Sequence, residues 1–124
     1  MDPIANMLVI IKNGYLAKKQ QVTVPYSKFK LEIAKVIAKE NFVGEVAKKE
    51  NQILVDLLYD AGSPKITEIK KISKLGRRFY TKSKHIKQLK GGRGSTIIST
   101  SKGVMSESDA KKKNLGGEVI CQIW

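Results

Sequence analysis

The sequence predicts an α+β protein of two small domains: an N-terminal α-β-α-β-β domain and a C-terminal β-rich domain with one short helix. Three observations support this prediction. Apolar residues follow a helical period in much of the first half and a strand period in most of the second. A turn-rich break at 60–64 divides the chain, and the positive charge rises sharply beyond it. We therefore expect domains at 1–62 and 65–124.

The first half opens with a predicted helix over 3–13. Asp2 is a suitable N-cap in front of Pro3, and apolar residues recur at helical spacing as far as Gly14. We expect Gly14 to end this helix. Alternation of valine with polar residues predicts a short strand at 22–24.

A second helix should follow, capped by Ser27 and continuing to about residue 41. Two β-rich segments, 42–48 and 52–59, flank a polar turn and are expected to pair as a hairpin. This order predicts one sheet covered by two helices.

The second half is dominated by strand patterns. Short β-rich segments at 66–72 and 78–81 precede a glycine-rich corner at 91–94 and a strand at 95–100. Ser106, with an acidic residue three positions later, predicts a short helix that ends near Lys113. The last strand, 118–124, should place three apolar side chains on one face: Val119, Cys121 and Ile123.

The charge of the chain is concentrated in its second half. Residues 1–64 hold nine Lys against seven acidic residues, whereas residues 65–124 hold fifteen Lys or Arg against four. The total of +13 exceeds the ~2–8 that solubility alone commonly requires of a small domain. Because 41% of the residues are apolar, the chain is too hydrophobic for a disordered basic tail. A folded protein that binds nucleic acid is the favoured interpretation.

Several kinds of chemistry lack the residues they need. One Cys and one His cannot form a disulfide or a zinc site, and His85 has no nucleophile in a recognisable setting. The glycines of 91–94 match neither common phosphate-binding loop. No apolar run approaches the ~20 residues of a membrane span, and we expect no secretory signal at the start of the chain. We expect no enzymatic activity, cofactor, metal, membrane partner or small-molecule substrate, and a reducing compartment.

One segment, 99–103, combines three adjacent hydroxyls with a lysine and a glycine at the end of a strand. These donors and acceptors suit the 2′-hydroxyls and base edges in the shallow groove of RNA, and the lysine suits a phosphate. The alternative is that the hydroxyls only satisfy the backbone of a turn. The residues concerned are Ser99, Thr100, Ser101 and Lys102.

The same segment opens a longer motif, Ile97-Ile98-Ser99-Thr100-Ser101-Lys102-Gly103-Val104-Met105 followed by Gly116-Gly117-Glu118-Val119-Ile120-Cys121. This motif resembles the C-terminal pattern of the ribosomal protein S8 family of the small subunit. The opening Asp2 to Leu8, the triplet Lys12 to Gly14 and the stretch Pro25 to Lys30 are similar to the N-terminal pattern of that family.

The resemblance implies a two-domain, non-catalytic protein of the cytoplasmic ribosome, organellar ribosomes not being excluded. Such a protein binds the central domain of small-subunit rRNA directly, supports assembly and lies beside other small-subunit proteins. The implied RNA-binding residues are Ser27, Lys28, Lys30, Arg78, Tyr80, Ser99, Thr100, Ser101, Lys102 and Glu118.

Two other interpretations remain open at this point. An RNA-processing enzyme would need a second acid–base group near His85, and a repressor of messenger RNA could use the same basic surface. The chain also departs from the family pattern at Leu75, His85, Ile86 and Arg93. The resemblance therefore predicts no local path for 74–94.

Overall fold

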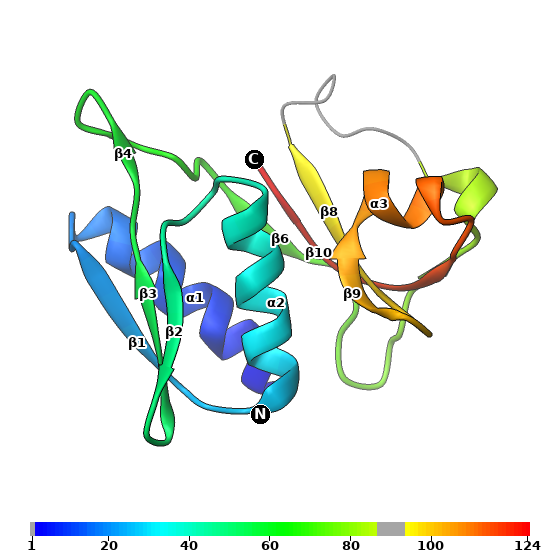
Figure 1. The fold of residues 1–124 in the computed structure, drawn as a ribbon, viewed down its shortest axis with the longest axis horizontal. Helices are drawn as coiled ribbons and strands as arrows, with labels where there is room; N and C mark the ends of the chain where they lie inside the picture. Colours follow the sequence, from blue (N-terminus) through cyan, green and yellow to red (C-terminus); the bar gives the residue numbers. More distant parts are fainter. Residues whose placement is uncertain (1, 87–93) are drawn as a thin grey trace. The chain divides into compact units, whose positions relative to one another are not determined.

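The computed structural model describes residues 2–86 and 94–124, which fold into two compact units, Met1–Glu68 and Ile69–Trp124 (Figure 1). The turn-rich stretch that suggested a boundary forms a small hairpin, β4 (Tyr59–Asp60) with β5 (Ser63–Pro64), inside the first unit. The second unit begins a few residues further along the chain, at Ile69.

The first unit contains two helices and an antiparallel three-stranded sheet. Its elements are α1 (Pro3–Leu16), β1 (Gln21–Pro25), α2 (Lys28–Lys39), β2 (Val46–Lys49) and β3 (Gln52–Asp56), and the strand order is β1-β3-β2. The predicted α-β-α-β-β order is confirmed. Helix α1 packs on β1 and α2 packs on β2, and their apolar faces bury Ile11, Ile33 and Ile37 completely.

Helix α1 begins as expected and ends later than expected. The Asp2 carboxylate caps it by accepting hydrogen bonds from the backbone N–H groups of Ile4 (3.0 Å) and Ala5 (3.2 Å). The prediction that Gly14 ends the helix was wrong, because the helix runs on to Leu16. A Cβ at Gly14 would lie 2.4 Å from Val22 Cγ1, so this glycine allows close packing on β1.

The second strand of the first unit is shorter than the predicted 42–48. Phe42 and Val43 are buried outside it, in a bend held by a buried hydroxyl. The Tyr15 hydroxyl donates to the Phe42 carbonyl at 2.6 Å and accepts from the Leu58 N–H at 3.0 Å. The Tyr15 side chain thus binds backbone groups of Phe42 and Leu58, where the β-rich sequence suggests pairing between two strands.

The second unit is β-rich with one short α-helix, as predicted. It contains β6 (Ile69–Lys71), β7 (Tyr80–Thr81), a 3₁₀ turn η1 (Ser83–His85), β8 (Ser95–Thr100), β9 (Gly103–Ser106), α3 (Glu107–Lys112) and β10 (Gly117–Ile123). The strand order is β6-β10-β8-β9, and β7 also pairs with β10. The glycine corner at Gly91 and Gly92, and Arg93 beside it, lie outside the described residues.

The long strand β10 contains a β-bulge that overturns one expectation. Val119 pairs with Ile98, whereas Cys121 pairs with Ile97, so the register shifts at the residue between them. Ile98 and Ile97 are consecutive in β8 and point to opposite faces of the sheet. Their partners Val119 and Cys121 therefore also lie on opposite faces. The expectation that Val119, Cys121 and Ile123 lie on one face was wrong.

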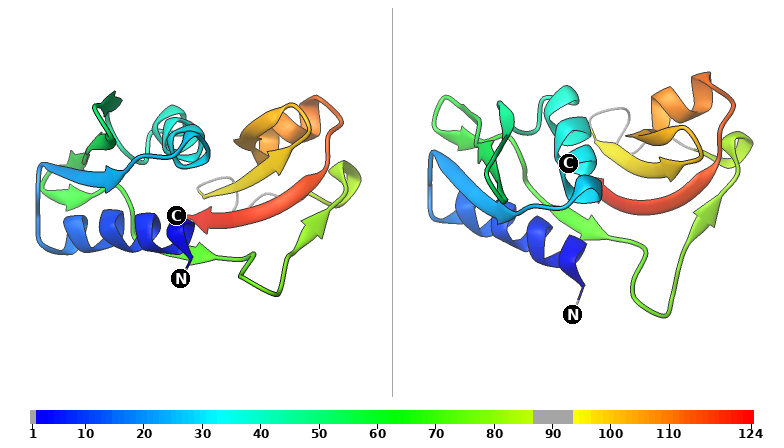
Figure 2. Two further views of the ribbon diagram at one scale, coloured as in Figure 1. Left: turned by 90° about the horizontal axis from the view of Figure 1, so that it is seen from below. Right: turned by 60° about the horizontal axis from the view of Figure 1, so that its bottom comes forward.

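Helix α3 covers part of one face of this sheet. The Ser106 hydroxyl caps it by accepting from the Asp109 N–H at 3.4 Å. Beneath it lies a buried apolar cluster of Ile86, Ile98, Met105 and Ala110, with Leu115 packed against it. The segment between β6 and β7 projects from the sheet as a loop in both views of Figure 2.

Candidate nucleic-acid interface

Three predicted site residues form a row across neighbouring strands of the second unit. Glu118 on β10 pairs with Tyr80 on one side and with Ser99 on the other. Directly paired residues of adjacent strands point to the same side of a sheet, so the three side chains share one face. Tyr80 is 67% exposed, which leaves its ring accessible at the edge of this row.

The Glu118 carboxylate is joined to this row by an ion pair. Arg78 Nη1 lies 3.1 Å from Glu118 Oε2, with 49% of the arginine side chain and 20% of the glutamate side chain exposed. A partly exposed pair of this kind contributes little to stability. It does fix the position of the guanidinium and of a hydrogen-bond acceptor on the same face as Ser99 and Tyr80.

The hairpin between β8 and β9 carries the hydroxyl cluster, and the structure separates the roles of its members. Thr100 Oγ1 donates to the Gly103 carbonyl at 2.8 Å and accepts from the Lys102 N–H at 3.1 Å. Gly103 has φ +110°, a conformation that other residues rarely adopt. Thr100 therefore fits the alternative interpretation, in which the hydroxyl satisfies the backbone of the turn.

Ser99 and Ser101 differ from Thr100. Within the residues that the structure describes, neither hydroxyl has a hydrogen-bond partner. Ser101 and Lys102 are both exposed at the tip of the hairpin, and Ser99 is half-buried in the row beside Glu118. These two hydroxyls are available for an external ligand.

Two glycines bring the strands of the interface together. A Cβ at Gly117 would lie 2.1 Å from the Ser99 carbonyl oxygen, and a Cβ at Gly116 would lie 2.4 Å from the Thr81 carbonyl oxygen. Both contacts are with backbone, which cannot move aside as a flexible side chain can. The glycine pair is thus required where β10 runs between β7 and β8.

The loop between β6 and β7 has a defined shape that sequence patterns did not predict. The completely buried Ser73 hydroxyl accepts from the Phe79 N–H at 2.9 Å and donates to the Phe79 carbonyl at 3.3 Å. Lys74 and Arg77 exchange two backbone hydrogen bonds at the tip. The only signal for this role was a small polar residue within an Ile- and Lys-rich stretch.

The second unit carries many exposed cations. They lie on β6, on the loop, next to or within η1 and in the hairpin: Lys70, Lys74, Arg77, Arg78, Lys82, Lys84 and Lys102. Glu118, the acid of the row, is already paired with one of them. The electrostatic character of this unit is therefore that of a surface for a polyanion.

The first unit contributes the other predicted residues, and their environments differ. Ser27 Oγ accepts from the Lys30 N–H at 3.1 Å and caps α2, so its hydroxyl has a structural task. Lys28 is exposed, whereas Lys30 is only 7% exposed. Of these three residues, Lys28 offers a cation at the surface.

Potential metal ligands do not cluster in the described ranges. Residues 2–86 and 94–124 contain no group of three or more His, Cys, Asp or Glu that could hold a metal ion. No helix among these residues is long and apolar enough to cross a membrane. His85 is exposed on η1.

The fold and the interface define a small, basic, two-unit α/β protein whose hydroxyls, cations and Arg–Glu pair gather on a β-rich unit. Residues 2–124 match the family model of ribosomal protein S8, and the chain belongs to this family. The resemblance seen in the sequence is confirmed. The family consists of structural ribosomal proteins and not of enzymes, so the interpretation as an RNA-processing enzyme is excluded.

Individual relatives support this assignment along the whole chain. Small ribosomal subunit protein uS8 of Oleidesulfovibrio alaskensis is 42% identical over 123 residues, which cover 99% of this chain and 98% of the relative. The proteins of the same name from Dictyoglomus turgidum and Mycoplasmopsis pulmonis are 41% and 42% identical, cover 99% of this chain and are themselves covered to 97% and 96%.

Proposed function

We propose that this protein is a structural constituent of the small ribosomal subunit that binds the central domain of small-subunit rRNA directly and supports subunit assembly. The observation that carries the proposal is the row of Tyr80, Glu118 and Ser99 next to the exposed Ser101–Lys102 turn. The ribosome of the cytoplasm is the corresponding location, and neighbouring small-subunit proteins are the corresponding protein partners.

The chemistry of this surface suits RNA in particular. The shallow groove of an RNA helix displays 2′-hydroxyls and base edges, which can both donate and accept hydrogen bonds. Ser99 and Ser101 supply hydroxyls of the same dual character, and neither has a partner within the described residues. Lys102 lies at the same hairpin tip and can meet a phosphate.

The Arg78–Glu118 pair adds selectivity to the electrostatic attraction. A guanidinium alone would bind phosphates of any nucleic acid, whereas a carboxylate repels them and accepts hydrogen bonds from hydroxyl or amino groups. The 3.1 Å contact holds these two groups together on the face of Tyr80 and Ser99. We infer that Glu118 favours a groove surface over bare backbone at this position, and that Lys28 of the first unit adds a phosphate contact.

Density-gradient sedimentation of a lysate tests the proposal. A tagged form of the chain should co-migrate with small subunits and with their assembly intermediates, and Ser101→Ala with Lys102→Ala should shift it toward the top of the gradient. The matched control is Ser63→Ala with Lys65→Ala, which removes the same two residue types from exposed positions of the first unit. A wild-type chain found only in free fractions, with or without messenger RNA, would contradict the proposal.

A further inference from the structure

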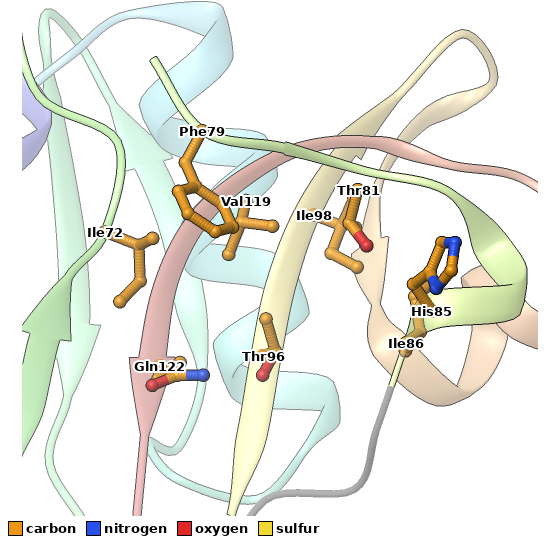
Figure 3. A pocket seen from close by; sticks show the side chains of 9 residues that line it. All are labelled: Ile72, Phe79, Thr81, His85, Ile86, Thr96, Ile98, Val119 and Gln122. Atoms are coloured by element: carbon orange, nitrogen blue, oxygen red, sulfur yellow. The ribbon is translucent and has the colours of Figure 1, made fainter. Parts of the chain in front are cut away.

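The second unit contains a pocket that the proposed interface does not use. It has a volume of about 340 Å³ and lies on the face of the sheet that α3 covers only in part. Figure 3 shows Phe79 and Val119 next to each other on one side, with Ile86 and His85 at the far end. The pocket volume falls within the range of small-molecule sites, which begins at about 300 Å³.

The walls of the pocket are apolar and include an aromatic ring. Val119 and Ile98 are paired across β10 and β8 and form the floor. Phe79 is tied to this floor because its carbonyl accepts from the Val119 N–H at 2.8 Å. Phe79 is nevertheless 57% exposed, which is unusual for phenylalanine. An apolar, flat ligand that covers this ring would remove the exposure.

One end of the pocket is polar. Thr96 and Gln122 are directly paired on β8 and β10, so both side chains project from the same face. Neither the threonine hydroxyl nor the glutamine amide has a hydrogen-bond partner within the described part of the chain. These groups can pair with the edge of a ligand whose flat face meets Phe79.

The pocket is separate from the row that contains Tyr80. Ile98 and Ser99 are consecutive in β8 and point to opposite faces of the sheet, and the pocket is lined by Ile98 and Phe79 but not by Ser99 or Tyr80. An exposed lysine also flanks the pocket, because Lys70 is paired with Gln122 and shares its face. A negatively charged ligand is therefore favoured.

We propose that this pocket binds one unstacked nucleobase of an RNA, with Phe79 against its face and Gln122 and Thr96 at its edge. The inference rests on the proposed rRNA-binding function. Proteins recognise single-stranded RNA by stacking splayed bases on aromatic side chains and by hydrogen bonds to the base edges. Because a glutamine amide can pair with adenine through two hydrogen bonds, adenine is the base that these groups fit.

Mononucleotide titration tests the pocket without any knowledge of the RNA sequence. In amide NMR spectra of the full chain, AMP should shift the signals of Thr96, Val119 and Gln122 more strongly than UMP or CMP does. Gln122→Leu should remove this preference. The proposal is overturned if none of the nucleotides shifts these signals, or if shifts occur only at Ser101 and Lys102.

An RNA-binding measurement then relates the pocket to the proposed function. Phe79→Ala should weaken binding to a central-domain rRNA transcript about tenfold, the order expected for one stacked base, and Phe79→Tyr should restore most of it. Leu75→Ala is the matched control, since Leu75 is a similarly exposed apolar residue (55%) outside the pocket, and it should change the affinity less than twofold.

The two proposals fail in different ways. If the wild-type chain binds the transcript and Ser101→Ala weakens it, but Phe79→Ala does not, the function stands and the base pocket is overturned. If Phe79→Ala leaves RNA affinity unchanged and lowers incorporation into small subunits, the occupant is a protein side chain, which also overturns the base pocket. If the wild-type chain does not bind the transcript, the proposed function itself fails.

Discussion

Arg78 and Glu118 form an ion pair at 3.1 Å on the sheet face that also presents Tyr80 and Ser99. The pair places a carboxylate within a surface that is otherwise cationic. A negative charge on a cationic surface lowers the affinity for phosphates of every RNA, so we expect Glu118 to contribute to selectivity between RNAs and not to affinity. A variant without this charge shows the effect on affinity and the effect on selectivity separately.

We expect Glu118→Gln to reduce selectivity and to leave total affinity intact or higher. Without the carboxylate, Arg78 is free to bind any phosphate, so binding to a scrambled RNA should rise and the cognate-to-scrambled ratio should fall about five- to tenfold. Filter binding with both RNAs at one salt concentration measures this. Glu45→Gln, an exposed residue of the first unit, makes the same change in net charge and should leave the ratio unaltered. An unchanged ratio for Glu118→Gln would remove this residue from the interface.

The two hydroxyls at the hairpin should respond differently to removal. Thr100→Val loses the bonds to Gly103 and Lys102, so we expect a lower melting temperature, with a stability loss of about 1 kcal/mol. Ser101→Ala removes a hydroxyl that has no partner within the described residues, and stability should be unaffected. It should instead weaken specific RNA binding by about 1–3 kcal/mol. Net charge stays the same in both variants, and a Ser101→Ala variant with unchanged specificity would contradict the assignment.

Salt dependence measures the electrostatic part of binding. If about six exposed cations neutralise phosphates, log affinity should fall with log salt at a slope of about −4 to −5, since each phosphate contributes about −0.7 to −0.9. Replacement of one exposed lysine, such as Lys70 or Lys84, should make the slope shallower by less than one and reduce affinity for all RNAs alike. A slope near zero for the wild-type chain would show that cations do not drive binding.

The pH dependence of stability should carry a contribution from Cys121. Burial raises the pKa of this thiol from 9.0 to about 12, and the nearby Lys71 partly opposes the rise. The unfolded chain therefore releases the thiol proton above about pH 9 while the folded chain retains it, so the free energy of unfolding falls as pH rises from 9 toward 12. Burial also raises the pKa of the Tyr15 phenol, which acts in the same direction.

Comparison with a variant isolates the cysteine. Urea unfolding of Cys121→Ala should start from a lower stability at pH 7, because the substitution leaves a cavity, and should decline less steeply between pH 9 and 11 than the wild-type chain. Parallel declines in the two proteins would show that the thiol does not ionise on unfolding in this range.

Much of the fold could be predicted because local patterns and packing agree. Asp2 caps a helix in front of Pro3 as predicted, Ser106 caps a helix as its spacing to Asp109 indicated, and the strand pattern at 95–100 is strand β8. The errors occur where tertiary contacts decide. Gly14 resembles a helix terminator in the sequence, but it is a glycine because α1 packs closely against Val22 of β1, and a helix pattern does not show this contact. The bulge after Val119 likewise depends on pairing with β8.

The candidate site was harder to resolve from the sequence because hydrogen bonding is not visible there. Thr100 and Ser101 are adjacent hydroxyl residues that the sequence does not distinguish. The Thr100 hydroxyl is hydrogen-bonded within the turn, whereas Ser101 is exposed at its tip. Lys28 and Lys30 look equivalent, but only Lys28 is exposed. The pocket beside Phe79 is lined by three segments that are distant in the chain, and no sequence motif predicts it.

The most direct test of the central claim is the equilibrium affinity of the purified chain for a transcript of the small-subunit rRNA central domain. A transcript of equal length from another rRNA domain, at the same salt concentration, provides the comparison. We predict that the chain binds the central-domain transcript at least about 100-fold more tightly, since phosphate contacts alone are shared by all RNAs and cannot create such a ratio. Equal affinities for the two transcripts would contradict the account.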